Sequence, residues 1–153
     1  MNTYFDNILD TVISEVNSIN YKIKGLNFLE ILKNNIIEKT SFVLQNQNPP
    51  IDHFNEIKKE INTENRHIKI FIKYISSPSV ITKKLIENDT MFLSLNETSS
   101  FDIYENDKNS IKIFLYKNMG LSLSRNTIIN AKFNKNVLLV EVQNKDIEQT
   151  LTN

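Results

Sequence analysis

Hydrophobic residues in the first sixty positions recur every three or four residues, which is the spacing of an amphipathic helix. This pattern predicts one helix over residues 5–19 and a second from Gly25 to about residue 44. Two adjacent prolines then predict a loop, because paired prolines cannot continue a helix. The same spacing resumes over residues 51–61 and predicts a short third helix.

The period changes to two from residue 66 onward. Ile68, Ile70 and Ile72 alternate there with Lys69, Phe71 and Lys73, as in a half-buried β-strand. Short strands separated by turn residues, with no helices between them, favour an antiparallel sandwich or barrel. After this first strand, the predicted strands are 80–86, 91–95, 101–105, 110–117, 121–125, 128–133 and 137–143.

These patterns predict an α+β protein with three segments. Residues 1–64 form a helical N-terminal segment, residues 65–144 form a β-barrel, and residues 145–153 form a C-terminal tail. The chain shows neither a secretory signal nor an 18-residue apolar run that would span a membrane. We therefore expect a cytoplasmic protein that does not associate with a membrane.

The composition excludes several kinds of site. The 153 residues include no cysteine and two histidines, which excludes disulfides, thiolate metal sites and a site of three imidazoles in one subunit. Eighteen basic and eighteen acidic residues give zero net charge, which argues against nucleic-acid binding by bulk electrostatics. The two glycines exclude a glycine-rich phosphate loop. We also expect asparagine to take the left-handed turn positions that glycine usually occupies.

One motif resembles a known family. The segment from Gly120 to Phe133 is similar to the second motif of the cupin superfamily, whose members are small jelly-roll barrels. Gly120 stands where the family has a glycine that opens a turn, and residues 125–127 (Arg-Asn-Thr) match its tight turn. Ser124 stands where proline is common, and Ile129 stands where the family has a metal-binding histidine.

The resemblance implies a barrel that has lost its metal ligands. The first cupin motif supplies two histidines and a glutamate, but residues 80–96 contain no histidine, and Glu87 is the candidate remnant of the glutamate. Transition metals in such barrels need imidazole donors. We therefore expect neither a metal nor another cofactor, and the metal-dependent activities of cupins are not carried over.

The position of Ile129 predicts which side chains face the barrel interior. Leu121, Leu123, Ala131 and Phe133 share its parity, and two neighbouring strands carry similar apolar sets, namely Ile111, Ile113, Leu115 and Met91, Leu93, Leu95. The interior is thus predicted to be apolar, and either plugged or open to an apolar ligand. The candidate ligand-binding residues, in the interior or at its rim, are Ile129, Ala131, Leu123, Tyr104, Tyr116 and Glu87.

No catalytic group is predicted. His53 is expected at the surface and His67 at a polar hinge between helices and barrel. The acidic pairs Asp102–Glu105 and Glu87–Asp89 lie at strand ends or turns, where solvated carboxylates are expected. The serines of the barrel lack a neighbouring histidine to act as base.

The leading hypothesis is a metal-free, cupin-like binding or assembly module with no chemistry of its own. We expect a homodimer, because edge strands of jelly rolls pair readily and the resemblance implies it. Two alternatives stay open. One is a metal-independent carbohydrate epimerase or isomerase of the cupin type, and the other is a small regulator whose barrel senses an apolar ligand.

Overall fold

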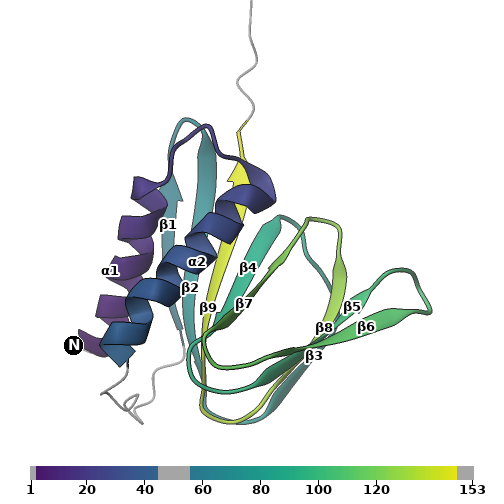
Figure 1. Ribbon diagram of the computed structural model, residues 1–153. Helices are drawn as coiled ribbons and strands as arrows, with labels where there is room; N and C mark the ends of the chain where they lie inside the picture. Colours follow the sequence, from purple (N-terminus) through teal and green to yellow (C-terminus); the bar gives the residue numbers. More distant parts are fainter. Residues whose placement is uncertain (1–2, 45–55, 148–153) are drawn as a thin grey trace, which may run out of the picture.

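The computed structural model describes residues 3–44 and 56–147, which form two helices followed by nine strands (Figure 1). The predicted α+β order, with helices first and strands second, is confirmed. The helices are α1 (Thr3–Ser18) and α2 (Gly25–Leu44). The strands are β1 (Glu56–Asn62), β2 (Arg66–Ile75), β3 (Ser79–Leu85), β4 (Asp89–Ser94), β5 (Ser99–Tyr104), β6 (Ser110–Leu115), β7 (Met119–Leu123), β8 (Ile128–Phe133) and β9 (Val137–Asp146).

Strands β2 to β9 are arranged as a long hairpin rolled up on itself. β2 pairs with β9, β3 with β8, β4 with β7 and β5 with β6, all antiparallel. Two further pairings, β4 with β9 and β5 with β8, complete the sheets β1-β2-β9-β4-β7 and β3-β8-β5-β6. Two facing sheets with this nested strand order form a jelly roll. The predicted antiparallel jelly roll is therefore confirmed.

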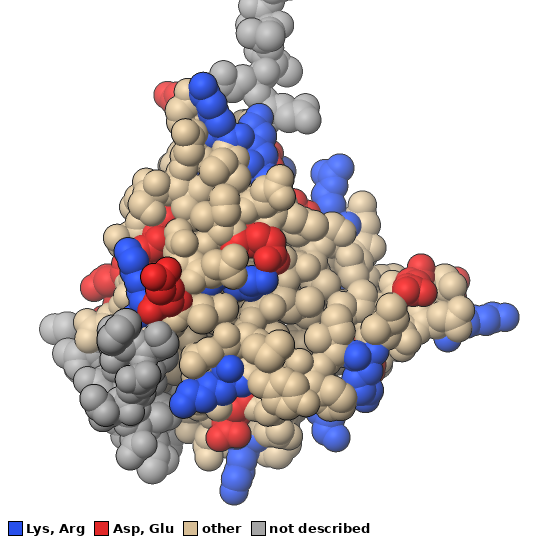
Figure 2. Space-filling view, viewed as in Figure 1, with Lys and Arg blue, Asp and Glu red and all other residues tan. Residues whose placement is uncertain are grey.

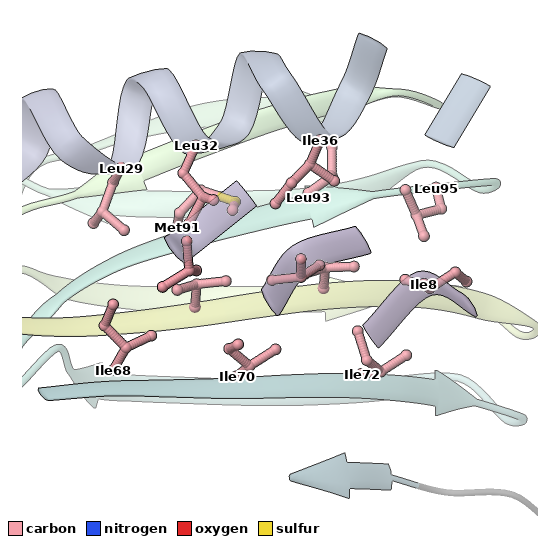
Figure 3. Close-up of a cluster of buried hydrophobic side chains, with 14 of the residues drawn as sticks. Ile8, Leu29, Leu32, Ile36, Ile68, Ile70, Ile72, Met91, Leu93 and Leu95 are labelled. Atoms are coloured by element: carbon pink, nitrogen blue, oxygen red, sulfur yellow. The ribbon is translucent and has the colours of Figure 1, made fainter. Parts of the chain in front are cut away.

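The central strands β4 and β9 of the five-stranded sheet are covered on both faces. Helices α1 and α2 lie across one face, and the four-stranded sheet lies on the other side (Figure 1). On the helix side, Leu29, Leu32 and Ile36 of α2 point toward the sheet, where Met91 and Leu93 of β4 and Ile70 of β2 are fully buried (Figure 3). This helix–sheet core gives the amphipathic faces of both helices a partner within the same chain.

A second core lies between the two sheets. Its centre is Phe101 of β5, whose ring centroid lies 5.2 Å from that of Phe92 and 5.9 Å from that of Phe133. Such edge-to-face and tilted arrangements are favourable for aromatic rings. The aromatic cluster joins β4 of the large sheet to β5 and β8 of the small one.

The predicted interior set on β4 was wrong. Met91, Leu93 and Leu95 belong to the helix–sheet core, whereas Phe92 faces the space between the sheets. Strand β4 is buried on both faces, so its run of apolar residues does not reveal which parity faces the barrel. Strand β9 has the same character, with Leu139 turned toward the barrel and its neighbours turned toward the helices.

The predicted third helix was also wrong where the structure describes it. Residues 56–62 form β1, which pairs with β2 and places Ile57 opposite Ile72 and Ile61 opposite Ile68. A spacing of four residues fits both a helix and one face of a strand, so the two isoleucines satisfied either pattern. The Thr63 hydroxyl accepts a hydrogen bond from the Arg66 backbone N–H at 3.1 Å and closes the hairpin.

Asparagine takes the left-handed turn positions, as predicted. Asn118, Asn126 and Asn136 have φ angles of 61°, 72° and 63°. Gly120, by contrast, does not open a turn as the motif implied, because it lies inside β7. A Cβ atom there would lie 2.4 Å from Cδ of Lys33, so the glycine lets α2 approach the sheet closely.

Arg66, at the start of β2, holds the loop between α1 and α2 in place. Its guanidinium carbon lies 3.9 Å from the ring centroid of Phe28, and its Nη2 donates to the backbone oxygen of Asn20 at 3.1 Å. Burial lowers the pKa of the guanidinium, and the nearby carboxylate of Asp146 opposes that shift. Asp146 also accepts a hydrogen bond at 2.8 Å from the N–H of Gly25, where α2 begins.

Acidic and basic side chains are interspersed over the face seen in Figure 2, around a broad uncharged area. Neither helix in the described part of the chain is long and apolar enough to cross a lipid bilayer.

The helix–sheet core predicts a large effect of a single truncation. Ile70→Ala should lower the free energy of unfolding by about 2–5 kcal/mol, because it opens a cavity under both helices. Val80→Ala, on the exposed side of β3, should change it by less than about 0.5 kcal/mol. Urea denaturation followed by circular dichroism measures both. Equal effects of the two substitutions would contradict the described packing.

Candidate functional site

A cavity of about 210 Å³ lies between the two sheets, beside Ile129. Its walls come from β2, β4 and β9 of the large sheet and from β3 and β8 of the small one. Most of the wall is apolar and includes Ile75, Ile81, Phe92, Ile129, Ala131, Phe133 and Leu139. Four polar side chains interrupt it, namely Lys73, Ser79, Lys84 and Glu141. The interior is thus mainly apolar, as predicted, but it is open and partly charged.

Glu141 on β9 is the buried charge of the cavity. Its side chain is 3% exposed, and its Oε1 lies 3.0 Å from Nζ of Lys73 on the neighbouring strand β2. The second carboxylate oxygen, Oε2, accepts a hydrogen bond from Nε2 of Gln143 at 2.7 Å. A buried carboxylate is costly unless it is paired and hydrogen-bonded, and here both oxygens have a donor.

Lys84 reaches the cavity through a β-bulge in β3. Ile81 pairs with Ala131 and Lys84 pairs with Ile129, so three steps along β3 match two steps along β8. The extra residue is accommodated at Lys83, whose φ is 51°. The side-chain amide of Asn130 accepts a hydrogen bond at 2.8 Å from the backbone N–H of Lys83. Bulges of this kind redirect a side chain, and here the redirected side chain is Lys84.

The bulge also places Lys83 on the outer face of the small sheet. Its Nζ lies 3.5 Å from the ring centroid of Tyr104. Two adjacent lysines therefore point to opposite sides of the sheet, one into the cavity and one away from it.

The charged groups of the cavity differ in how far they are already paired. Each carboxylate oxygen of Glu141 accepts one hydrogen bond, from Lys73 and from Gln143. Lys84 has no such partner, because no carboxylate of residues 3–44 or 56–147 forms an ion pair with it.

The structure brings together two of the six residues predicted from the sequence. Ile129 and Ala131 both line the cavity. Leu123 is buried in the same core between the sheets but is not part of the cavity wall. Whether any of these residues contacts a ligand stays a prediction.

The other three predicted residues lie outside the cavity. Tyr104 is on the outer face of the small sheet, where its hydroxyl accepts a hydrogen bond from Nδ2 of Asn130 at 2.8 Å. The ring of Tyr116 is exposed and stacks on Phe114 at 6.3 Å. Glu87 is exposed in the turn between β3 and β4.

The histidines do not contribute to the cavity wall in the part of the chain that is described. His67 is exposed on β2, and His53 lies outside the described residues. Within residues 3–44 and 56–147, no group of three or more histidine, cysteine, aspartate or glutamate side chains could hold a metal ion.

Sequence reasoning missed all four polar residues of the cavity. One signal was available for Glu141, which is the one charged residue in an apolar run over residues 137–142. A charge inside such a run predicts a buried charge that needs a partner. Lys84 had no comparable signal, because the bulge that redirects it depends on backbone geometry at Lys83.

Comparison with known proteins gave structural likenesses only. No family model matches the chain, and no curated protein matches it. A cupin superfamily protein from Desulfitobacterium hafniense is similar in structure at 15% identity, over 68% of this chain and 94% of that one, with a TM-score of 0.42. An RmlC-like cupin family protein from Methanocaldococcus jannaschii is 13% identical, over 65% of this chain and 86% of that one, with a TM-score of 0.40.

A further likeness is to CENP-C from Drosophila melanogaster, solved bound to CAL1. It is 6% identical, over 57% of this chain and 80% of that one, with a TM-score of 0.44. These likenesses concern the fold alone. The nested strand pairing described above establishes the jelly-roll topology that the sequence predicted.

The buried ion pair predicts a non-additive pair of substitutions. Lys73→Met should lower the free energy of unfolding by about 1–3 kcal/mol, because it leaves Glu141 buried with one donor. Adding Glu141→Leu should recover most of that loss, since it removes the unpaired charge.

The matched control is Lys112→Met, which breaks the ion pair between Lys112 and Asp102 on the small sheet, away from the cavity. It should change the free energy of unfolding by less than about 1 kcal/mol. Urea denaturation of the single and double variants measures the coupling. Strictly additive effects of Lys73→Met and Glu141→Leu would contradict the pairing.

Proposed function

We propose that this chain is a binding module whose barrel takes one small, largely apolar molecule, and that it performs no chemistry on it. The observation that carries the proposal is the cavity of about 210 Å³ beside Ile129, whose wall is mainly apolar. Concave, mainly apolar pockets with a few polar groups are the usual form of small-molecule sites.

An isomerase or epimerase is the second candidate. One observation favours it, namely that one glutamate and two lysines line a single cavity. Such enzymes need a base that can reach a substrate proton, and the two donors on Glu141 argue against that role. A regulator that responds to the bound molecule is compatible with the same site. Location in the cytoplasm stays a prediction from the sequence.

Filling the cavity tests the binding proposal. Ala131→Leu places a larger apolar side chain on the cavity wall and should abolish binding of toluene, a neutral apolar probe. Methyl-detected NMR titration of the folded variant measures the loss. Val80→Leu adds the same kind of bulk on the exposed side of β3 and should leave binding unchanged. Equal toluene affinity in the wild type and Ala131→Leu would contradict the proposed site.

We further propose that two copies associate through β1. In the described residues β1 has a strand neighbour on one side only. Antiparallel pairing of two β1 strands about Lys59 places Lys58 of each copy opposite Glu60 of the other, and Ile57 opposite Ile61. Opposite charges and matched apolar side chains across strands are favourable. The sequence of β1 is thus complementary to itself in this register.

Charge reversal tests the β1 interface. Lys58→Glu places two acidic side chains opposite each other at both ends of the pairing and should raise the dimer dissociation constant about tenfold. The double substitution Lys58→Glu with Glu60→Lys restores opposite charges and should restore the dimer. Sedimentation equilibrium measures the dissociation constant, and thermal melts confirm folding. A wild-type chain that stays monomeric at millimolar concentration would contradict the interface.

A further inference from the structure

We propose that the cavity selects small organic anions, specifically monocarboxylates with an apolar body, and that Lys84 holds the carboxylate. This inference rests on the proposed function, because it names the class of ligand that the same cavity takes.

The charges on the cavity wall do not cancel. Lys73 and Lys84 each carry a positive charge, and Glu141 carries the one negative charge. Glu141 forms an ion pair with Lys73, in which Oε1 lies 3.0 Å from Nζ. Its other oxygen, Oε2, accepts a hydrogen bond from Nε2 of Gln143 at 2.7 Å. Lys84 therefore contributes an uncompensated positive charge to a half-buried, mostly apolar wall. An anion from solution would supply the missing charge, and attraction is stronger there than in water.

The position of Lys84 in the fold supports this role. A regular β3 would place Lys83 rather than Lys84 on the inner face, two residues after Ile81. The bulge reverses that arrangement, and it requires a left-handed φ of 51° at a lysine. Non-glycine residues adopt this conformation at a cost. The backbone thus adopts an unfavourable conformation at Lys83, and the Lys84 side chain lies on the cavity side of β3.

The remaining wall specifies the body of the ligand. Ile129 and Ala131 lie beside Lys84 on the small sheet, and Phe92 faces them from the large sheet. A cavity of 150 Å³ in another protein holds one benzene ring, so 210 Å³ admits a ring with one small substituent. The substituent that fits an ammonium group is a carboxylate. Benzoate therefore has the size and charge that the cavity requires.

The test compares three probes of one shape and different charge. Isothermal titration calorimetry of the full chain uses benzoate, benzyl alcohol and benzylamine as the anionic, neutral and cationic probes. Benzoate should bind at least about tenfold more tightly than benzyl alcohol, and benzylamine should bind more weakly than either. Lys84→Gln should abolish the preference for benzoate, and Lys84→Arg should retain it.

The matched control is Lys83→Gln, which removes the neighbouring lysine on the outer face. It should leave the preference for benzoate intact, and circular dichroism melts establish that every variant folds. Equal binding of benzoate and benzyl alcohol would overturn the inference and leave the proposed function standing. A benzoate preference that survives in Lys84→Gln would overturn the role of Lys84. Failure of all three probes to bind would contradict the proposed function as well.

Discussion

The central strands β4 and β9 of the five-stranded sheet need cover on both of their faces, and the rest of the molecule follows from that requirement. Strand β4 is buried along nearly its whole length, and β9 carries large apolar side chains on both sides. Burial of that surface is the main favourable term in folding. Helices α1 and α2 supply one cover and the four-stranded sheet supplies the other, so the helices are part of the core rather than an appendage.

This division of the apolar residues explains why the barrel interior stays open. Met91 and Leu93 are turned toward the helices and cannot fill the space between the sheets. The aromatic cluster around Phe101 closes one part of that space. In the part beside Ile129, Glu141 and Lys73 occupy the wall of the large sheet, and a hydrogen-bonded ion pair takes the place of apolar side chains there. The same residues that keep the cavity open give it charge.

The strands of the jelly roll could be predicted from the sequence because alternation is a strong signal in half-buried strands such as β2 and β8. The signal fails where a strand is buried on both faces, which explains the error at Met91. It is ambiguous where two apolar residues are four apart, which explains the error at Ile57. At the site, Ile129 and Ala131 followed from the family motif, whereas Lys84 depended on a bulge that no local pattern of hydrophobicity encodes.

The central claim is that a ligand binds between the sheets and not under the helices. Methyl-labelled protein titrated with benzoate tests it most directly, because each methyl group reports its own surroundings. The account predicts shift changes for the methyl groups of Ile129 and Ala131, with Ile70 and Leu32 on the helix side unaffected. Shifts confined to Ile70 and Leu32, with none at Ile129 and Ala131, would contradict it.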